Sequence, residues 1–490
     1  MTTFADDHPI VAALADLAAE APDAPAFTSE RSTLSRAEVE ARTNRLARGY
    51  QDLGVRPDDF VTIGLPNGIG FFESVIATWK CGATPQPISY RLPPREREAI
   101  IELADPALVV GVAEAGGRPT VDAWFEADPL LSDEPVPIVV ASSYKAPTSG
   151  GSTGCPKLIV ASQPAVTGAL TPFIPLLQMT TNGSHLVTGP LYHNGPLMMA
   201  MVALIAGNHI TIMPRFDAAE TLRLISEQRV DWVYAVPTML SRIWKLPEET
   251  RNAFDLSSLR IVFHMAAPCP EWLKRAWIGW LGPERVYELY GGTEAQAVTF
   301  ISGTEWLEHP GSVGKVLVGE MRILDADGNE LGPHEVGQVW MRRDAGGTPT
   351  YRYVGAEATT REDHWEWLGD LGYFDEDGYL YLADRETDMI LVGGANVYPA
   401  EVEAALEEHP AVASACVIGL PDDDLGAVPH AIVQTVTDVN DDELVSHLTE
   451  ALARYKIPRS FERTDEPLRD DAGKVRRSAL RDDLLAARGT

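Results

Sequence analysis

Apolar residues recur with two different periods along the first hundred positions, and each period predicts one type of element. Spacings of three and four residues predict helices, and alternating runs predict strands; the helices are expected over 8–20, 35–53, 71–80 and 94–103, and the strands over 59–65 and 107–112. Ser35 and Glu38 open the second helix with the pattern of a capping box. Because strands and helices alternate, the sequence predicts layers of α/β structure.

The same alternation continues through the middle of the chain. Short apolar runs predict strands over 209–213, 232–236 and 260–265, each followed by helix-like sequence, and a helix is expected over 163–177. The apolar run 197–205 is too short to span a membrane, so we interpret it as buried core.

The last third of the chain shows a different pattern of apolar residues. Glycines and short alternating runs over 310–345 predict a small β subdomain. Further on, the pattern predicts helices over 399–408 and 441–454, with strands over 413–418 and 430–436. This segment therefore reads as a small α+β domain that follows the larger α/β one.

A glycine-rich stretch between two apolar runs, 136–141 and 158–160, is the first candidate for chemistry, and it reads as a loop between two strands. Its candidate ligand-binding residues are Thr148, Ser149, Gly150, Gly151, Ser152, Thr153, Gly154 and Lys157. Glycines let successive N–H groups turn toward one centre, which, with hydroxyls and a lysine, suits a polyphosphate. The stretch is not a Walker A motif, and a glycine-rich loop is by itself often only a linker.

A second motif follows the apolar run 286–289, so we expect it at the end of a strand, where open α/β sheets bind ligands. It consists of Tyr290, Gly291, Gly292, Thr293 and Glu294. Taken alone, this pentapeptide could equally be a tight turn. Its occurrence after the glycine-rich stretch makes chance a poor explanation for the pair.

Composition and charge narrow the class of protein. The chain has 490 residues, which is more than one core usually supports, and a net charge of −31. With no dominant basic region, nucleic acid is an unexpected partner. Four widely spaced cysteines form no metal or disulfide pattern, and the N-terminus lacks a basic leader, so we expect a cytoplasmic protein. No apolar run is long enough to span a membrane, and we expect a monomer or a homodimer.

Together these motifs resemble the adenylate-forming superfamily, which contains acyl-CoA synthetases, the adenylation domains of nonribosomal peptide synthetases, and firefly luciferase. The resemblance covers nearly the whole chain, because further motifs follow in the family's order. They are His193, the segment Ala266, Ala267 and Pro268, then Asp370, Arg385, Gly394 and Lys474. The family fold implies an N-terminal adenylation domain over 1–384 and a mobile C-terminal domain over 385–490.

The resemblance also implies a role for each motif. Tyr290 would stack on adenine beside the segment 266–268, Gly291 and Gly292 would leave room for the acyl group, and Thr293 would bind a phosphate oxygen. Glu294 would hold Mg²⁺, which takes few carboxylates and keeps phosphate oxygens as ligands.

The later motifs complete the implied site. Asp370 would bind both ribose hydroxyls, Arg385 would contact ribose and phosphate, and Lys474 would bridge the substrate carboxylate and the α-phosphate. Gly394 would line a tunnel for the pantetheine of coenzyme A. The usual hinge residue, Asp or Lys, is replaced here by Thr387. A hinge needs only to absorb a change of backbone angles, so the role stays plausible.

The implied reaction joins a carboxylic acid to ATP as an acyl-adenylate with release of pyrophosphate, and then transfers the acyl group to coenzyme A. An amine acceptor, with His193 as base, stays open, as do a remote luciferase-like oxygenation and a non-catalytic nucleotide sensor. His193, Tyr234, Met265, Gly291 and Gly292 are the expected walls of the acid pocket. They favour an apolar, aromatic, fatty or polycyclic acid, and the overall look resembles bacterial ligases for bulky acids such as bile acids.

Overall fold

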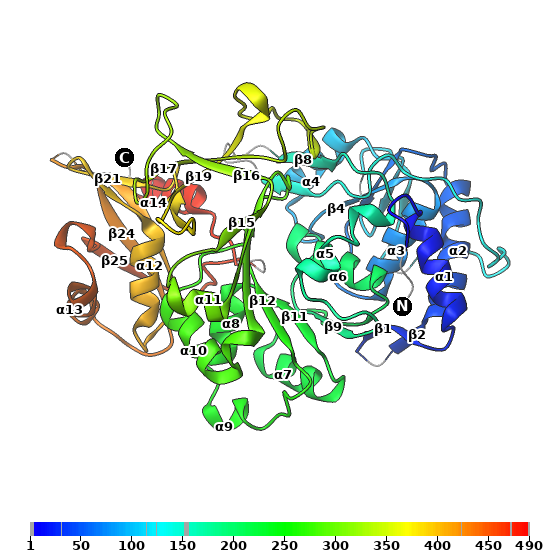
Figure 1. Ribbon diagram of the computed structural model, residues 1–490, viewed down its shortest axis with the longest axis horizontal. Helices are drawn as coiled ribbons and strands as arrows, with labels where there is room; N and C mark the ends of the chain where they lie inside the picture. The colour runs from blue at the N-terminus through cyan, green and yellow to red at the C-terminus, as the bar shows by residue number, and fades with distance from the viewer. Residues whose placement is uncertain are drawn as a thin grey trace.

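The computed structural model describes residues 4–30, 32–113, 115–123, 125–150, 156–422, 424–470 and 473–488. Within them the fold is mixed α/β, with a large N-terminal part and a small C-terminal part side by side (Figure 1). The helices are α1 (Ile10–Glu20), α2 (Arg36–Asp52), α3 (Ile69–Lys80), α4 (Pro94–Ala104), α5 (Phe173–Leu176), α6 (Asn194–Ile205), α7 (Ala218–Glu227), α8 (Pro237–Trp244), α9 (Glu248–Arg251), α10 (Glu271–Leu281), α11 (Gly303–Glu308), α12 (Pro399–Glu408), α13 (Asp441–Ala451) and α14 (Arg477–Arg488).

The largest sheet of the described chain runs through the N-terminal part. In spatial order its strands are β15 (Lys315–Val318), β14 (Val298–Ser302), β13 (Val286–Gly291), β12 (Ile261–His264), β11 (Trp232–Ala235), β9 (Ser184–Val187), β10 (His209–Ile212), β1 (Pro25–Ser29) and β2 (Ser32–Ser35). The strands from β13 to β1 are parallel to one another. Their carboxyl ends therefore meet at one edge of the sheet.

Three smaller sheets complete the N-terminal part. One contains β4 (Thr84–Pro87), β3 (Phe60–Ile63), β5 (Leu108–Val110) and β6 (Thr120–Val121). The second contains β18 (Tyr351–Val354), β8 (Pro156–Ala161) and β7 (Thr148–Gly150). The third contains β16 (Glu320–Leu324), β17 (Gly337–Arg342), β19 (Glu366–Phe374) and β20 (Leu380–Arg385), so the predicted β-rich segment is present.

The C-terminal part has its own sheet and its own apolar core. The strands are β22 (Ala395–Val397), β21 (Ile390–Val392), β24 (Gly426–Thr435), β23 (Val412–Asp422) and β25 (Ser460–Thr464). Its apolar clusters draw their residues from 390–485, whereas the main core of the chain lies within 10–379. A boundary at 384/385 stays a prediction.

Most of the predicted elements are confirmed, and their local causes are visible. Ser35 caps α2 as expected, because its hydroxyl accepts from the Glu38 N–H while the Glu38 carboxylate accepts from the Ser35 N–H. The apolar run 197–205 lies in α6, which is buried along almost its whole length. No helix among the described residues has both the length and the apolar character needed to cross a bilayer.

Two predicted elements are wrong, and proline explains both. The run 136–141 forms no strand, and Ile138 is 55% exposed; Pro135 and Pro137 offer no N–H for a ladder. The strand before the glycine-rich loop is instead β7. The helix expected over 163–177 is reduced to a 3₁₀ turn and the single turn of α5, because three prolines, Pro164, Pro172 and Pro175, interrupt it.

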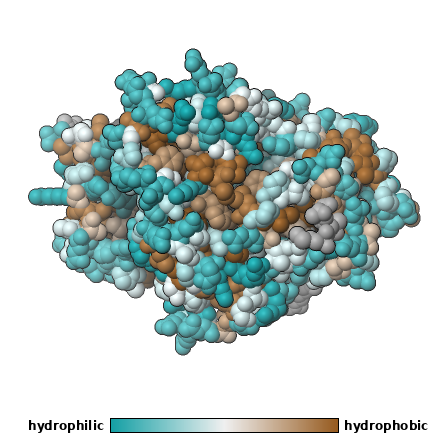
Figure 2. Space-filling model, viewed as in Figure 1, coloured by the Kyte–Doolittle hydropathy of each residue, from teal (hydrophilic) through white to brown (hydrophobic). Residues whose placement is uncertain are grey.

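The face shown in Figure 2 has apolar residues gathered across its middle, with polar residues around them. Figure 1 places β15 and neighbouring strands of the large sheet near the middle of this view.

Candidate active site

The loops that follow four parallel strands form one wall of the candidate site. Strands β9, β11, β12 and β13 are neighbours in register, so the segments after them leave the sheet at the same edge. These segments carry most of the predicted pocket. They are the turn before His193, the segment that begins at Val236, the segment 266–268, and the pentapeptide, whose Tyr290 and Gly291 end β13 and whose last three residues follow it.

Glu294 is the central carboxylate of this wall. It is 7% exposed, and its Oε1 accepts a 2.6 Å hydrogen bond from the Tyr353 hydroxyl. Its backbone carbonyl accepts from the Thr350 hydroxyl at 2.6 Å. The Lys157 Nζ lies 3.8 Å from the same Oε1 and 3.8 Å from the centre of the Tyr353 ring. Tyr353 thus holds both the carboxylate and the lysine in place.

The glycine-rich hairpin lies beside Glu294. β7 and β8 pair antiparallel, with Ser149 opposite Lys157, so the two strands that flank residues 151–155 lie side by side. The Thr148 hydroxyl accepts a 2.7 Å hydrogen bond from the Gln86 amide. Four of the predicted phosphate-binding residues, namely Gly151, Ser152, Thr153 and Gly154, lie outside the described residues.

A second cluster joins Tyr290 to the β19–β20 hairpin. The Tyr290 hydroxyl donates to Asp370 Oδ2 at 2.7 Å, and Arg385 Nε lies 3.3 Å from Asp370 Oδ1. Burial and the Asp370 charge both raise the pKa of Tyr290 well above its usual value, so its hydroxyl stays protonated as a donor. Three predicted nucleotide-binding residues therefore touch one another, although they are far apart in sequence.

Close packing surrounds the two glycines of the pentapeptide. A Cβ at Gly292 would lie 2.4 Å from Leu368 Cδ1 and 2.9 Å from Glu294 Oε2. A Cβ at Gly291 would lie 2.8 Å from Val298 Cγ1. Both positions are half-buried, as is Thr293 in the turn that follows. Only glycine fits these two positions without moving a neighbour.

The other predicted wall residues take their places around this centre. Ala266 has a left-handed φ of +77°, a conformation that costs a non-glycine residue roughly 1 kcal/mol or more. Ala267 and Pro268 follow it. Met265 is half-buried and Tyr234 is buried, with its hydroxyl against Gly195, where a Cβ would lie 2.7 Å away.

His193 stands at the N-terminus of α6, with its ring centre 4.6 Å from that of Tyr192. The next residue, Asn194, accepts a hydrogen bond from the buried Lys145 through its side-chain oxygen. The Lys145 Nζ also lies 3.9 Å from Met198 Sδ. This contact fixes the start of α6 against the strand-like segment that leads into the glycine-rich hairpin.

The C-terminal part contributes Lys474 to the site. Its neighbour Gly473 packs against the segment after β11, where a Cβ would lie 3.2 Å from Thr238 Oγ1. Its surroundings lower the pKa of Lys474, by desolvation first and then by the charge of Arg385, and the charges of Asp470 and Glu294 oppose this shift. Lys474 therefore lies within electrostatic range of Arg385 and Glu294.

Gly394 is not brought to this site in the present arrangement. It lies in the exposed turn between β21 and β22, with a left-handed φ of +88° that favours glycine. A Cβ there would meet no atom within 4 Å. Thr387 is exposed in the turn after β20, so the hinge assignment stays a prediction.

Sequence reasoning missed two residues of the centre, Lys145 and Tyr353. Lys145 could have been noticed as a lysine in a largely apolar stretch close before Thr148. Tyr353 had no such signal, because it lies 59 positions from Glu294 and reaches it only through the pairing of β18 with β8.

Three lysines thus lie within electrostatic range of one carboxylate, and Arg385 lies within electrostatic range of Lys157 and Lys474. Desolvation lowers the pKa values of Lys145, Lys157 and Lys474, and the charge of Glu294 opposes each shift. A bound polyanion would favour their charged forms. Among the described residues no three acidic, histidine or cysteine side chains gather as a metal site. Glu294 could still hold Mg²⁺ if phosphate oxygens complete the coordination, as this ion prefers.

Comparison with known proteins agrees with this geometry. Residues 14–351 match the model of the AMP-binding enzyme family, and residues 401–474 match that of the AMP-binding enzyme C-terminal domain. The chain belongs to the AMP-binding enzyme family.

Named relatives of this AMP-binding enzyme are similar over most of its length. Feruloyl-CoA synthase from Amycolatopsis is 32% identical over 94% of this chain and 96% of its own. A 2-succinylbenzoate–CoA ligase from Bacillus licheniformis is 34% identical over 68% of each chain. The solved o-succinylbenzoate CoA synthetase from Bacillus subtilis, in complex with its acyl-adenylate intermediate, has a TM-score of 0.82 and 28% identity, covering 97% of this chain and 98% of that one.

The buried Lys145 generates a prediction about stability. Burial lowers its pKa to about 7, whereas the unfolded chain keeps the lysine protonated to about pH 10.4. Between these values the unfolded state binds more protons, so this residue makes the free energy of unfolding rise with pH, by up to about 1.4 kcal/mol per unit. The free energy of unfolding of Lys145→Met, relative to that of wild type, should therefore be highest at pH 7. This difference should shrink toward pH 10.

Urea denaturation of both proteins at several pH values measures this difference. Lys456→Met is a control, because Lys456 lies at the surface of the C-terminal part, paired with Glu401 at 2.7 Å. A difference between Lys145→Met and wild type that stays constant from pH 7 to pH 10 would contradict the prediction.

Proposed function

We propose that this protein is an ATP-dependent carboxylic acid ligase that forms an acyl-adenylate and then passes the acyl group to coenzyme A. The observation that carries the proposal is the gathering of Lys157 and Lys474 near Glu294, with Arg385 within electrostatic range of both lysines. The Tyr290–Asp370 pair lies beside this cluster and suits a nucleoside. Family membership and the CoA-ligase relatives support the same conclusion.

The first step joins two anions, so the site must reduce their repulsion. A carboxylate oxygen attacks the α-phosphorus of ATP, a carbon–oxygen–phosphorus bridge forms, and the bond to the β-phosphate breaks to release pyrophosphate. Lys474 places a positive charge between the carboxylate and the α-phosphate, while Lys157 offsets charge on the leaving phosphates. Mg²⁺ held by Glu294 would supply further positive charge at the phosphates.

The character of the expected acid pocket follows from the residues that form its walls. Tyr234, Met265 and the two glycines give the expected walls little charge, which suits an apolar or aromatic acid. His193 immediately precedes α6, and its imidazole could accept a proton from the attacking nucleophile. In the second step the thiol of coenzyme A attacks the carbonyl carbon, AMP leaves, and a base takes the thiol proton.

Pyrophosphate release tests the proposal directly. The protein, with ATP and Mg²⁺, should release pyrophosphate in the presence of at least one member of a panel of aromatic, fatty and polycyclic acids. Adding coenzyme A in one arm and a simple amine in another then identifies the acceptor. A panel that yields no pyrophosphate would sink the adenylation, and thioester formation no faster than adenylate hydrolysis would exclude coenzyme A as acceptor.

Lys474→Ala should separate catalysis from binding. Because its charge acts where negative charge builds up, its loss should lower the rate of pyrophosphate release by about 10²–10³-fold. ATP affinity, measured by calorimetry, should change only a few-fold, and Lys456→Ala serves as a control in the same domain. Equal losses of affinity and rate would contradict the assigned role.

Tyr353→Phe should lower the rate of pyrophosphate release, because it removes a hydrogen bond that holds Glu294. Loss of a hydrogen bond to a charged group costs about 1.5–3 kcal/mol, which corresponds to roughly 10- to 100-fold in the rate of pyrophosphate release. The Mg²⁺ concentration for half-maximal rate should also rise. Tyr50→Phe is the matched control, because the buried Tyr50 hydroxyl donates to the Ser74 hydroxyl at 3.2 Å and not to Glu294. Identical effects of the two variants would remove Tyr353 from the site.

A further inference from the structure

The segment that carries Lys474 has no helix or strand of its own among its described residues. It lies between β25 and α14, and its local hydrogen bonds close on Asp470: the Gly473 N–H donates to the Asp470 carbonyl at 2.9 Å, and the Lys474 N–H donates to the Asp470 carboxylate at 2.9 Å. Such a turn fixes its own shape but not its place on the domain. Other contacts must set where Lys474 points.

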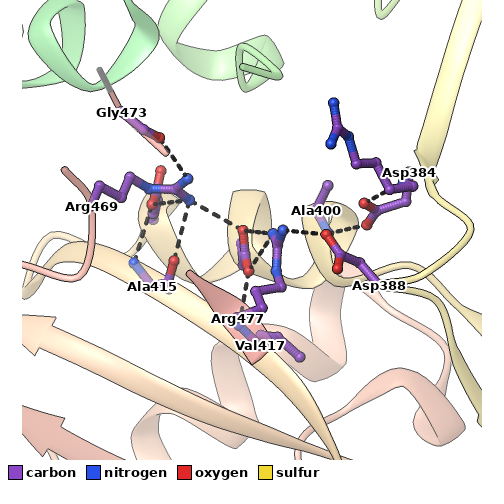
Figure 3. Close-up of polar contacts among 11 residues, drawn as sticks. Asp384, Asp388, Ala400, Ala415, Val417, Arg469, Gly473 and Arg477 are labelled. Atoms are coloured by element: carbon purple, nitrogen blue, oxygen red, sulfur yellow. Dashed lines mark hydrogen bonds and ion pairs between the residues drawn. The ribbon is translucent and has the colours of Figure 1, made fainter. Parts of the chain in front are cut away.

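Two arginines bracket this segment and reach the same carboxylate. Arg469 precedes Lys474, and its Nη2 lies 3.1 Å from Glu403 Oε2; its Nη1 also donates to the Gly473 carbonyl at 3.4 Å. Arg477 follows Lys474, and its Nη2 lies 2.9 Å from both oxygens of Glu403. Figure 3 shows the two guanidinium groups converging from either end of the segment.

Glu403 is a fixed anchor for both arginines. It belongs to α12, is 3% exposed, and accepts a further hydrogen bond from the Val417 N–H at 2.8 Å. A desolvated carboxylate that accepts hydrogen bonds from two guanidinium groups and a backbone N–H has little freedom to move. Both ends of the Lys474 segment are therefore tied to the junction of α12 and β23.

Arg477 also connects this anchor to the segment that follows the nucleotide residues. Its Nη1 donates to Asp388 Oδ2 at 2.9 Å, in the turn after β20 (Figure 3). One residue before Arg385 on the same strand, Asp384 accepts from the Ala400 N–H at 3.0 Å, in the first turn of α12. The arginine thus links Lys474 to the chain that carries Arg385.

We propose that Arg477, Arg469 and Glu403 are positioning residues that hold Lys474 at the nucleotide site. This inference rests on the proposed function, because Lys474 acts there on the α-phosphate. The three residues touch neither substrate, so their effect reaches the reaction only through Lys474. Arg477 is the critical member, because a planar fork can engage Glu403 and Asp388 at once and a lysine cannot.

Arg477→Lys keeps the charge and removes the fork, so it tests the proposal. The maximal rate of pyrophosphate release should fall by about 10- to 100-fold, as expected for a displaced catalytic group, while KM for ATP stays within about twofold. Glu403→Gln should act in the same direction. Glu408→Gln, at an exposed position of the same helix, should leave both values unchanged.

A double variant separates positioning from general destabilisation. In a Lys474→Ala protein, adding Arg477→Lys should lower the remaining rate by less than about twofold, because the group that Arg477 positions is already gone. If the second change instead lowers the rate as much as it does in wild type, the inference is overturned.

Hydrogen exchange provides a readout that does not require activity. The amides of Gly473 and Lys474 should exchange faster in Arg477→Lys than in wild type or Glu408→Gln, and unchanged exchange would also overturn the inference. If wild type releases no pyrophosphate with any acid, the proposed function fails, and this measurement still decides whether Arg477 holds the segment.

Discussion

The site depends on an excess of positive charge held beside one carboxylate. Lys157 lies 3.8 Å from Glu294, and Lys145 and Lys474 lie within electrostatic range of it, so one carboxylate faces three lysines. Desolvation lowers the pKa values of these lysines, and a bound polyanion opposes this effect. The chain as a whole carries −31, which repels ATP at long range. Salt screens that repulsion beyond about 8 Å, so the local cluster decides binding.

The parallel sheet and the C-terminal part position different residues of the candidate site. Neighbouring strands bring the segments proposed to bind the nucleotide and the acid to one edge of the sheet, where the strands fix the Tyr290 and Glu294 segments. The C-terminal part brings Lys474 on an irregular segment, which needs buried ion pairs to hold it. A catalytic lysine placed in this way can be delivered without disturbing the nucleotide pocket, because its support lies around Glu403 on its own domain.

The hydrophobic pattern was enough for most elements because their periods are strong and their ends carry local signals, as at the Ser35 cap. It failed where proline overrode an apolar run, at 136–141 and at 163–177. In both segments the residues are apolar enough for regular structure, but the missing N–H groups prevent it. The hydrophobic pattern does not show which residues lack a backbone N–H.

The sequence by itself determined the family motifs: the glycine-rich stretch, the pentapeptide ending in Glu294, Asp370 and Lys474 stand in a recognisable order. Only the tertiary structure decided which side chains support them. Lys145 and Tyr353 belong to the centre because β8 pairs with β18 and α6 packs beside the hairpin. The spacing of residues in the sequence predicts geometry only over one or two turns of the chain. Contacts between distant strands exist only once the sheets have formed.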